Sequence, residues 1–173
     1  MNIIVRQSFW SSIVIYIGVV LGFVNSIILF PQFLSTEQIG IVRQLISAAT
    51  LLIPITTFGV NASYVKFYPN FVDDKSQKNQ FFIYELTVIL LSYCIVFAFL
   101  NLFYEDIRGL FTEKSRLLFN YFDVFLLILF CLSISTLFES FLRARYDTVV
   151  SNVVNGVSNR ILTALTLILF SLS

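Results

Sequence analysis

The 173-residue sequence contains no histidine, and only 12% of its residues are charged. Histidine is the commonest general base, proton switch and metal ligand near neutral pH, so its absence removes much of enzyme chemistry. A typical soluble domain is about one quarter charged. The net charge is only +1, so the chain also lacks the basic character of a nucleic-acid-binding protein, and we expect no nucleic-acid partner.

Cysteine is equally scarce. Cys94 and Cys131 are the only two, and each stands alone inside an apolar run, without the spacing of a metal site or a disulfide framework. No nucleophile elbow and no phosphate-binding loop is recognisable. The adjacent acidic pair Asp73–Asp74 lies in a polar stretch typical of a solvated loop. We therefore expect no catalytic residue, no metal site and no cofactor, and interpret the chain as something other than an enzyme.

Apolar residues, in contrast, make up 58% of the chain and gather in five long blocks. Each block is close to the roughly 20 residues that a helix needs to cross a bilayer. A membrane β-barrel would instead show alternating segments of about ten residues. The sequence thus predicts an all-α polytopic transmembrane bundle of about five helices, forming a single domain over residues 1–173. The predicted helices cover residues 9–30, 40–60, 81–104, 120–142 and 149–172.

The first block is interpreted as a membrane helix, because the run from Phe9 to Phe30 is long for a signal peptide and no cleavage site follows it. Lysine and arginine concentrate in cytoplasmic loops. A cytoplasmic N-terminus places six basic residues in inner segments and four in outer ones, so we predict this orientation in the cytoplasmic membrane. The inner six are Arg6, Lys66, Lys75, Lys78, Arg143 and Arg145, and the outer four are Arg43, Arg108, Lys114 and Arg116.

Polar residues inside the blocks recur every three or four positions, so they fall on single helical faces. Such a face either packs against another helix or lines a watery cavity. Packing is favoured for Gly18 and Gly22 and for the serines and threonine of the fourth block. Cavity lining is favoured for the second and fifth blocks, because each carries an arginine. Their faces are Arg43, Ser47, Thr50, Pro54, Thr57 and Asn61, and Asn152, Asn155, Asn159, Thr163 and Thr166 with Gly156 and Arg160 alongside.

Single charges refine this picture. Arg160 lies near the middle of the fifth block, which favours anion binding or a buried ion pair. For Arg43, cavity lining and snorkelling to the interface are equally open. Glu85 and Asp123 lie near predicted helix ends and are expected to reach headgroup water, and Tyr64 with Tyr68 is interpreted as an interfacial belt. The candidate substrate or cavity residues are Arg43, Arg160, Asn25, Asn61, Asn155 and Asn159.

Three short motifs connect the chain to a known family. Leu-Ser-Thr-Glu-Gln-Ile-Gly begins at Leu34, Phe-Gly-Val-Asn-Ala-Ser begins at Phe58, and Tyr-Val-Lys-Phe-Tyr-Pro ends at Pro69. Together with the fifth block, they resemble the Wzx-type polysaccharide flippases of the multidrug/oligosaccharidyl-lipid/polysaccharide exporter superfamily. The resemblance covers nearly the whole chain.

This resemblance implies a fold of two pseudo-symmetric lobes of six helices and the flipping of an undecaprenyl-diphosphate-linked oligosaccharide between leaflets. It implies membrane lipid and the lipid-linked oligosaccharide as partners, with basic cavity residues such as Arg43 and Arg160 meeting the diphosphate. Because the sequence holds five helices, we expect it to correspond to the N-terminal part, without the sixth helix and the second lobe.

Two alternatives stay open. A multidrug exporter of the same superfamily would place carboxylates in its cavity, whereas the centres of the first, second and fifth blocks contain no aspartate or glutamate. A non-transporting membrane scaffold or fragment would assemble with glycosyltransferase partners and show no transport defect on deletion.

Overall fold

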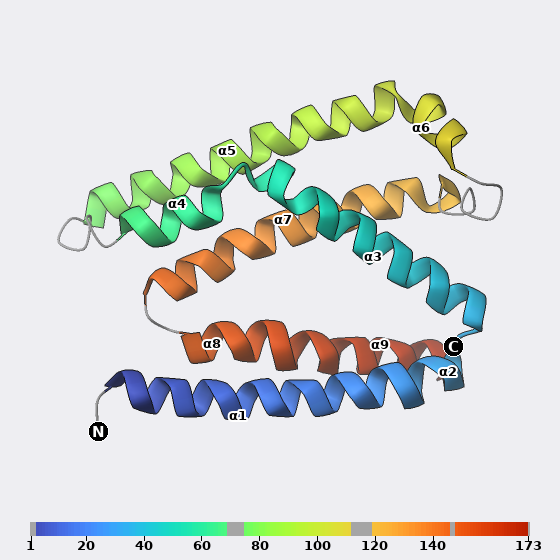
Figure 1. Cartoon of the computed structure of the whole chain (residues 1–173), viewed down its shortest axis with the longest axis horizontal. Helices are drawn as coiled ribbons and strands as arrows, with labels where there is room; N and C mark the ends of the chain where they lie inside the picture. Colours follow the sequence, from blue (N-terminus) through green and yellow to red (C-terminus); the bar gives the residue numbers. More distant parts are fainter. Residues whose placement is uncertain (1–2, 69–74, 112–118, 146–147, 173) are drawn as a thin grey trace. The chain divides into compact units, whose positions relative to one another are not determined.

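The computed structural model describes residues 3–68, 75–111, 119–145 and 148–172, and the regular elements in these ranges are all helices (Figure 1). The all-α prediction is therefore confirmed. Four helical segments of the described chain are long and apolar enough to cross a membrane: Arg6–Phe33, Thr36–Thr57, Ser76–Leu102 and Phe119–Ala144. The fifth predicted helix is present as a helical run over residues 148–172 but is not one of these four.

The chain divides into two compact units. The first comprises Met1–Gly40 and Arg145–Ser173, and the second comprises Ile41–Ala144. Each unit is described by itself below. The single transmembrane domain expected over residues 1–173 stays a prediction.

The first unit is a pair of helical runs side by side (Figure 1). The first run consists of α1, η1 and α2, and the second consists of α8, η4 and α9. In the second run, α8 and η4 pack against α1, and α9 packs against η1 and α2. Each run contains a π-helical segment, in which the backbone turn is one residue wider than in an α-helix. The elements are α1 (Ile3–Phe23), η1 (Val24–Leu29) and α2 (Phe30–Phe33), then α8 (Thr148–Asn152), η4 (Val153–Ser158) and α9 (Asn159–Leu172).

Glycine permits a close approach between the backbones of these two runs. A Cβ atom added to the buried Gly18 of α1 would lie 3.0 Å from the backbone carbonyl oxygen of Gly156 in η4. Small residues at membrane helix interfaces allow backbones to approach in this way. The packing role predicted for Gly18 is confirmed.

We expect Gly18→Ala to lower the stability of the first unit by about 1–3 kcal/mol, the usual cost of overpacking, because backbone rather than a side-chain tip must move. Thermal unfolding of the purified protein in detergent measures this. Gly40→Ala is the matched control, since a Cβ there meets nothing within 4 Å, and the better helix propensity of alanine should make it neutral or slightly stabilising. Equal melting temperatures for the two variants would contradict the close approach.

The second unit contains helix α3 from Ile41 onward, together with α4, α5, α6 and α7. The chain breaks between α3 and α4, where Phe58 and Gly59 both take positive φ angles of 49° and 77°. Such angles suit glycine and interrupt a helix. Both α4 and α5 pack on α7. The bounds are α3 (Thr36–Thr57), α4 (Val60–Phe67), α5 (Lys75–Leu102), α6 (Tyr104–Leu110) and α7 (Phe122–Ala144).

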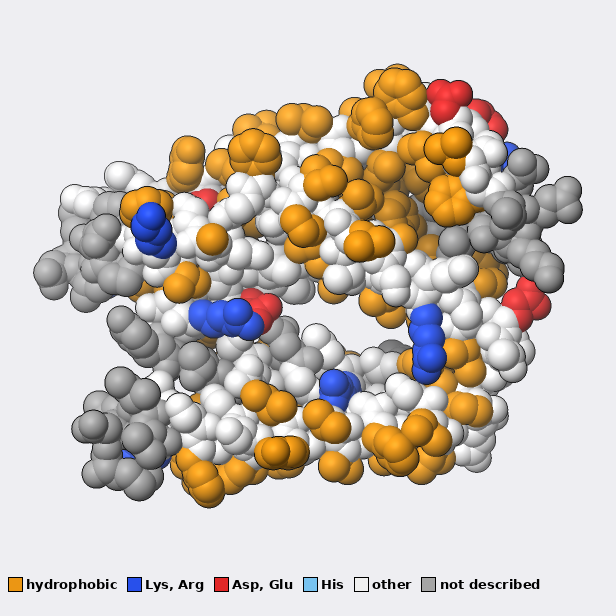
Figure 2. Space-filling model, in the orientation of Figure 1, with side chains coloured by type: hydrophobic (Ala, Val, Ile, Leu, Met, Phe, Trp, Pro, Cys, Tyr) orange, Lys and Arg blue, Asp and Glu red, His pale blue; other side chains and the backbone are white. Residues whose placement is uncertain are grey.

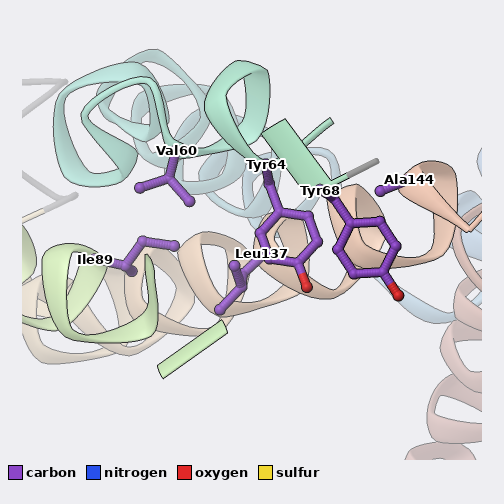
Figure 3. Close-up of a cluster of buried hydrophobic side chains, with 6 residues drawn as sticks. All are labelled: Val60, Tyr64, Tyr68, Ile89, Leu137 and Ala144. Atoms are coloured by element: carbon purple, nitrogen blue, oxygen red, sulfur yellow. The ribbon is translucent and has the colours of Figure 1, made fainter. Parts of the chain in front are cut away.

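A hydrophobic cluster around two tyrosines, called the aromatic cluster below, lies in the core of this unit (Figure 3). Tyr64 is 0% exposed, and its ring stacks on Tyr68 and Phe81 with centroid distances of 5.3 and 5.2 Å. The interpretation of Tyr64 and Tyr68 as an interfacial belt was therefore wrong, because α4 turns both rings onto α5 and α7. The buried members of the cluster are Val60, Tyr64, Tyr68, Ile89, Leu137 and Ala144.

A buried hydroxyl pair joins α3 to α7. The Oγ1 atom of Thr56 and the Oγ atom of Ser133 lie 2.7 Å apart, and both side chains are fully buried. Interhelical hydrogen bonds of this kind hold membrane helices together. At Ser133, this bond confirms the packing role predicted for the polar residues of the fourth block.

The helices expose large hydrophobic side chains over much of their outward surface (Figure 2). Soluble monomers rarely expose extended apolar patches. Together with four helices of membrane-spanning length, this surface identifies a multi-pass membrane protein whose outer face contacts lipid.

Candidate functional site

A polar pocket lies inside the first unit, between the run α1–η1–α2 and helix α9. Two of the six candidate residues, Asn25 and Arg160, meet there although 135 positions separate them. The remaining lining mixes small, hydroxyl and apolar side chains. The lining residues are Val19, Gly22, Asn25, Ser26, Phe30, Arg160 and Thr163.

Asn25 ties the two sides of the pocket together. Its side chain is 6% exposed, and its Nδ2 atom donates a hydrogen bond of 2.8 Å to the backbone carbonyl oxygen of Arg160. A buried amide that lost this partner would cost roughly 1–3 kcal/mol. The bond therefore fixes the position of α9 against η1 at the residue that carries the guanidinium.

The guanidinium of Arg160 occupies the space that Gly22 leaves free. A Cβ atom at Gly22 would lie 2.8 Å from both Cζ and Nη1 of Arg160. In the described part of the chain, Nη1 is buried and has no hydrogen-bond partner. The ion pairs found there join other residues, Arg108 with Glu105 and Arg143 with Glu139. Of the two roles predicted for Arg160, the buried ion pair is thus not observed among the described residues.

An arginine in this state favours an anionic ligand. The Arg160 side chain is half-buried, and a cation partly withdrawn from water without a counter-charge is unfavourable. In a membrane helix such a cation usually faces a bundle interior or a watery cavity. The planar fork of the guanidinium binds carboxylate and phosphate oxygens with two parallel hydrogen bonds. The pocket can therefore bind an acidic group, with Gly22 giving the guanidinium room and Asn25 holding its backbone.

The π segment η1 borders the pocket, and the other, η4, ends two residues before a lining residue. Asn25 and Ser26 belong to η1, and Arg160 is the second residue after η4. Single π turns within α-helices often occur at functional sites, because they change the direction in which side chains point.

Of the other four candidates, three lie outside the pocket. Asn159 is exposed on α9, and the side chain of Asn155 lies outside the described residues. Arg43 is exposed on α3, and Asn61 is half-buried on α4, both in the second unit. The Oδ1 atom of Asn61 is buried and has no hydrogen-bond partner in the described part of the chain.

Five of the seven lining residues were not among the candidates: the apolar Val19 and Phe30, and Gly22, Ser26 and Thr163. Gly22 was interpreted only as a packing residue, Ser26 was not selected, and Thr163 was placed on the polar face without a role. A sequence signal did exist, because Gly22, Asn25 and Ser26 recur at three and four residues and so share one helical face.

These features define a class: a polytopic helical membrane protein with an arginine-containing pocket between two helical runs. A family model described as "Polysaccharide biosynthesis protein" matches residues 4–172. The chain belongs to this family, which confirms the resemblance drawn from the loop motifs. No curated protein and no solved structure gives a significant match. Family and fold together identify a membrane transporter of polysaccharide biosynthesis.

Proposed function

We propose that this protein takes part in translocating a lipid-linked oligosaccharide, the precursor of a polysaccharide, across the cytoplasmic membrane. The observation that carries the proposal is the guanidinium of Arg160, which lies in a pocket with Nη1 buried and unbonded among the described residues. The acidic group that it would bind is the diphosphate that links lipid to sugar.

The composition of the pocket supports an anion over a cation. Its lining contains one arginine, an amide and two hydroxyl side chains, and no carboxylate among the described residues. A multidrug exporter of cationic compounds would need the opposite charge. The guanidinium supplies the forked donor, and Ser26 adds a hydroxyl donor beside it.

Binding also has to be reversible for transport, because a site that holds its substrate too firmly does not release it. Arg160 reaches the pocket by a flexible side chain that rests on Gly22. Movement of α9 against η1 would therefore change the position of the guanidinium.

The proposal includes the orientation and the partners. The distribution of basic residues favours a cytoplasmic N-terminus. Membrane lipid surrounds the helices, and glycosyltransferases that build the oligosaccharide are the proposed protein partners. Arg43, Asn61, Asn155 and Asn159 stay proposed as further substrate-facing residues.

Replacing Arg160 by alanine tests the site. We expect Arg160→Ala to reduce surface polysaccharide about tenfold or more in cells that depend on this gene, since a charge-assisted hydrogen bond contributes about 1.5–3 kcal/mol. Arg160→Lys should retain part of the activity, because it keeps the charge without the fork. Surface polysaccharide and the amount of protein in the membrane are measured together.

Arg108→Ala is the matched control, because Arg108 is exposed, pairs with Glu105 and lies outside the pocket. It should leave polysaccharide at the normal level. Normal polysaccharide in Arg160→Ala cells with a normal protein level would overturn the assignment.

A further inference from the structure

Glu85 is a buried acid that the pocket does not use. It lies on α5 ten residues after Lys75, which corresponds to about 15 Å along the helix. Its side chain is only 2% exposed. The expectation that Glu85 reaches headgroup water was therefore wrong.

Among the described residues, Glu85 accepts a hydrogen bond from one hydroxyl and shares its helical face with apolar core residues. The Oγ atom of Ser63 on α4 donates a hydrogen bond of 2.9 Å to Oε1 of Glu85. Phe81 and Ile89, four residues before and after Glu85, share its helical face. Both belong to the aromatic core or pack against it.

No described cation neutralises this carboxyl group. Lys66 on α4 lies over the ring of Phe67, and Lys78 on α5 itself lies over the ring of Tyr68. The arginines of α6 and α7 pair with acids of their own helices. The titratable groups on the elements that contact α5 are Tyr64 and Lys66 on α4, Tyr104, Glu105, Asp106 and Arg108 on α6, and Asp123, Cys131, Glu139 and Arg143 on α7.

A carboxylate in this position would be costly. An ionised group buried away from water loses several kcal/mol of solvation, and one neutral hydrogen bond does not offset this loss. A carboxyl group that carries a proton avoids the cost, and its second oxygen still accepts the hydrogen bond from Ser63. In membrane transporters, ionisable side chains of this kind mark ion pathways and proton relays.

We propose that Glu85 is a proton-binding site that couples translocation to proton movement. The carboxyl group takes a proton from water on one side of the membrane when the second unit exposes it, carries it as a neutral group while buried, and returns it to water on the other side. No redox step or further reactant is needed. The coupling rests on the proposed translocation, whereas the binding of the proton does not.

A metal cation fits this site poorly. Hard cations need about six oxygen ligands, whereas Glu85 has one hydroxyl partner, and the described residues contain no cluster of three metal-ligating side chains.

Infrared spectroscopy tests proton binding without any transport. The full chain in lipid nanodiscs should show the C=O stretch of a protonated carboxyl group at neutral pH, and Glu85→Gln should remove it. Glutamine retains an oxygen that can accept the hydrogen bond from Ser63. The exposed Glu37 gives the control variant, since Glu37→Gln should leave this band unchanged. A band of equal size in wild type and Glu85→Gln would overturn the proposal.

A transport assay tests the coupling. In proteoliposomes supplied with lipid-linked oligosaccharide, an imposed pH gradient should accelerate translocation by the wild type severalfold and have no effect on Glu85→Gln. Stimulation of Glu85→Gln by the gradient, or stimulation of the wild type by sodium alone, would overturn the coupling. If the wild type translocates nothing under any gradient, the proposed function fails and the coupling with it. The infrared band then still decides whether Glu85 holds a proton.

Discussion

Gly22→Ala is expected to reduce translocation about tenfold while leaving the helices folded. The added Cβ would lie 2.8 Å from the guanidinium carbon of Arg160, so something must move. Because the guanidinium is the tip of a flexible side chain, it moves more easily than either backbone. The positive charge then leaves its place in the pocket, and a charge-assisted hydrogen bond to the substrate is lost or lengthened.

A double-mutant cycle checks this explanation. If Gly22 acts through Arg160, then Gly22→Ala should add almost nothing to the loss caused by Arg160→Ala, because coupled residues are not additive. Surface polysaccharide is measured for both single variants and for the double variant, with membrane protein levels beside them. Fully additive losses would show that Gly22 serves another role. Gly18→Ala provides the contrast, because its Cβ would press on the Gly156 carbonyl oxygen at 3.0 Å but only reach ordinary contact with Nη1 of Arg160 at 3.4 Å. It should therefore act mainly on thermal stability.

Tyr64→Ala should destabilise the second unit by about 3 kcal/mol, the lower part of the range for removing a buried aromatic ring. The ring is fully buried and contacts Tyr68 and Phe81 by stacking and Phe82 edge-on. Within a bilayer this loss comes mainly from packing, because lipid tails are as apolar as the protein core. Thermal unfolding and the monodisperse fraction after gel filtration in detergent report the effect.

Two variants separate the burial of the Tyr64 ring from the loss of any tyrosine and from the loss of its hydroxyl group. Tyr84 is 63% exposed on α5, so Tyr84→Ala should change stability by no more than about 0.5 kcal/mol. Tyr64→Phe keeps the ring and isolates the contribution of the hydroxyl group. If Tyr84→Ala were as damaging as Tyr64→Ala, the aromatic cluster would not be the core of this unit.

The helices could be predicted because a long apolar run in a membrane has few alternatives to a helix. Their ends were less certain, since polar residues can extend a helix beyond the apolar run. Helix α5 begins at Lys75, six residues before the predicted start at residue 81. This difference explains the error at Glu85, which lies five residues into the predicted helix but eleven residues into the observed one.

The contents of the pocket were only partly predictable. Polarity inside an apolar block selected Asn25 and Arg160 separately, but nothing in the sequence shows that the amide of one bonds the backbone of the other. Gly22 illustrates a further limit. A glycine at helical spacing suggests close packing of backbones, whereas here the missing side chain makes room for a guanidinium.

The break after α3 accounts for the error at the two tyrosines. Hydropathy indicated a polar loop from residue 61, but positive φ angles at Phe58 and Gly59 end one helix and allow another to begin at Val60. The new helix places Tyr64 and Tyr68 four residues apart on one inward face, which an irregular loop would not do.

The two π segments also change the direction in which the side chains after them point around the helix axis. A π turn holds one residue more than an α turn, so side chains beyond it are offset by about 100° from a continuous α-helical count. The stripe counted through residues 152–166 crosses η4. Beyond that segment, its member Thr163 lines the pocket and its member Asn159 does not, whereas Arg160 from beside the stripe does. Converting either π segment to a regular α-helix would therefore require the loss of one residue, within 24–29 or 153–158, to keep the same side chains in the pocket.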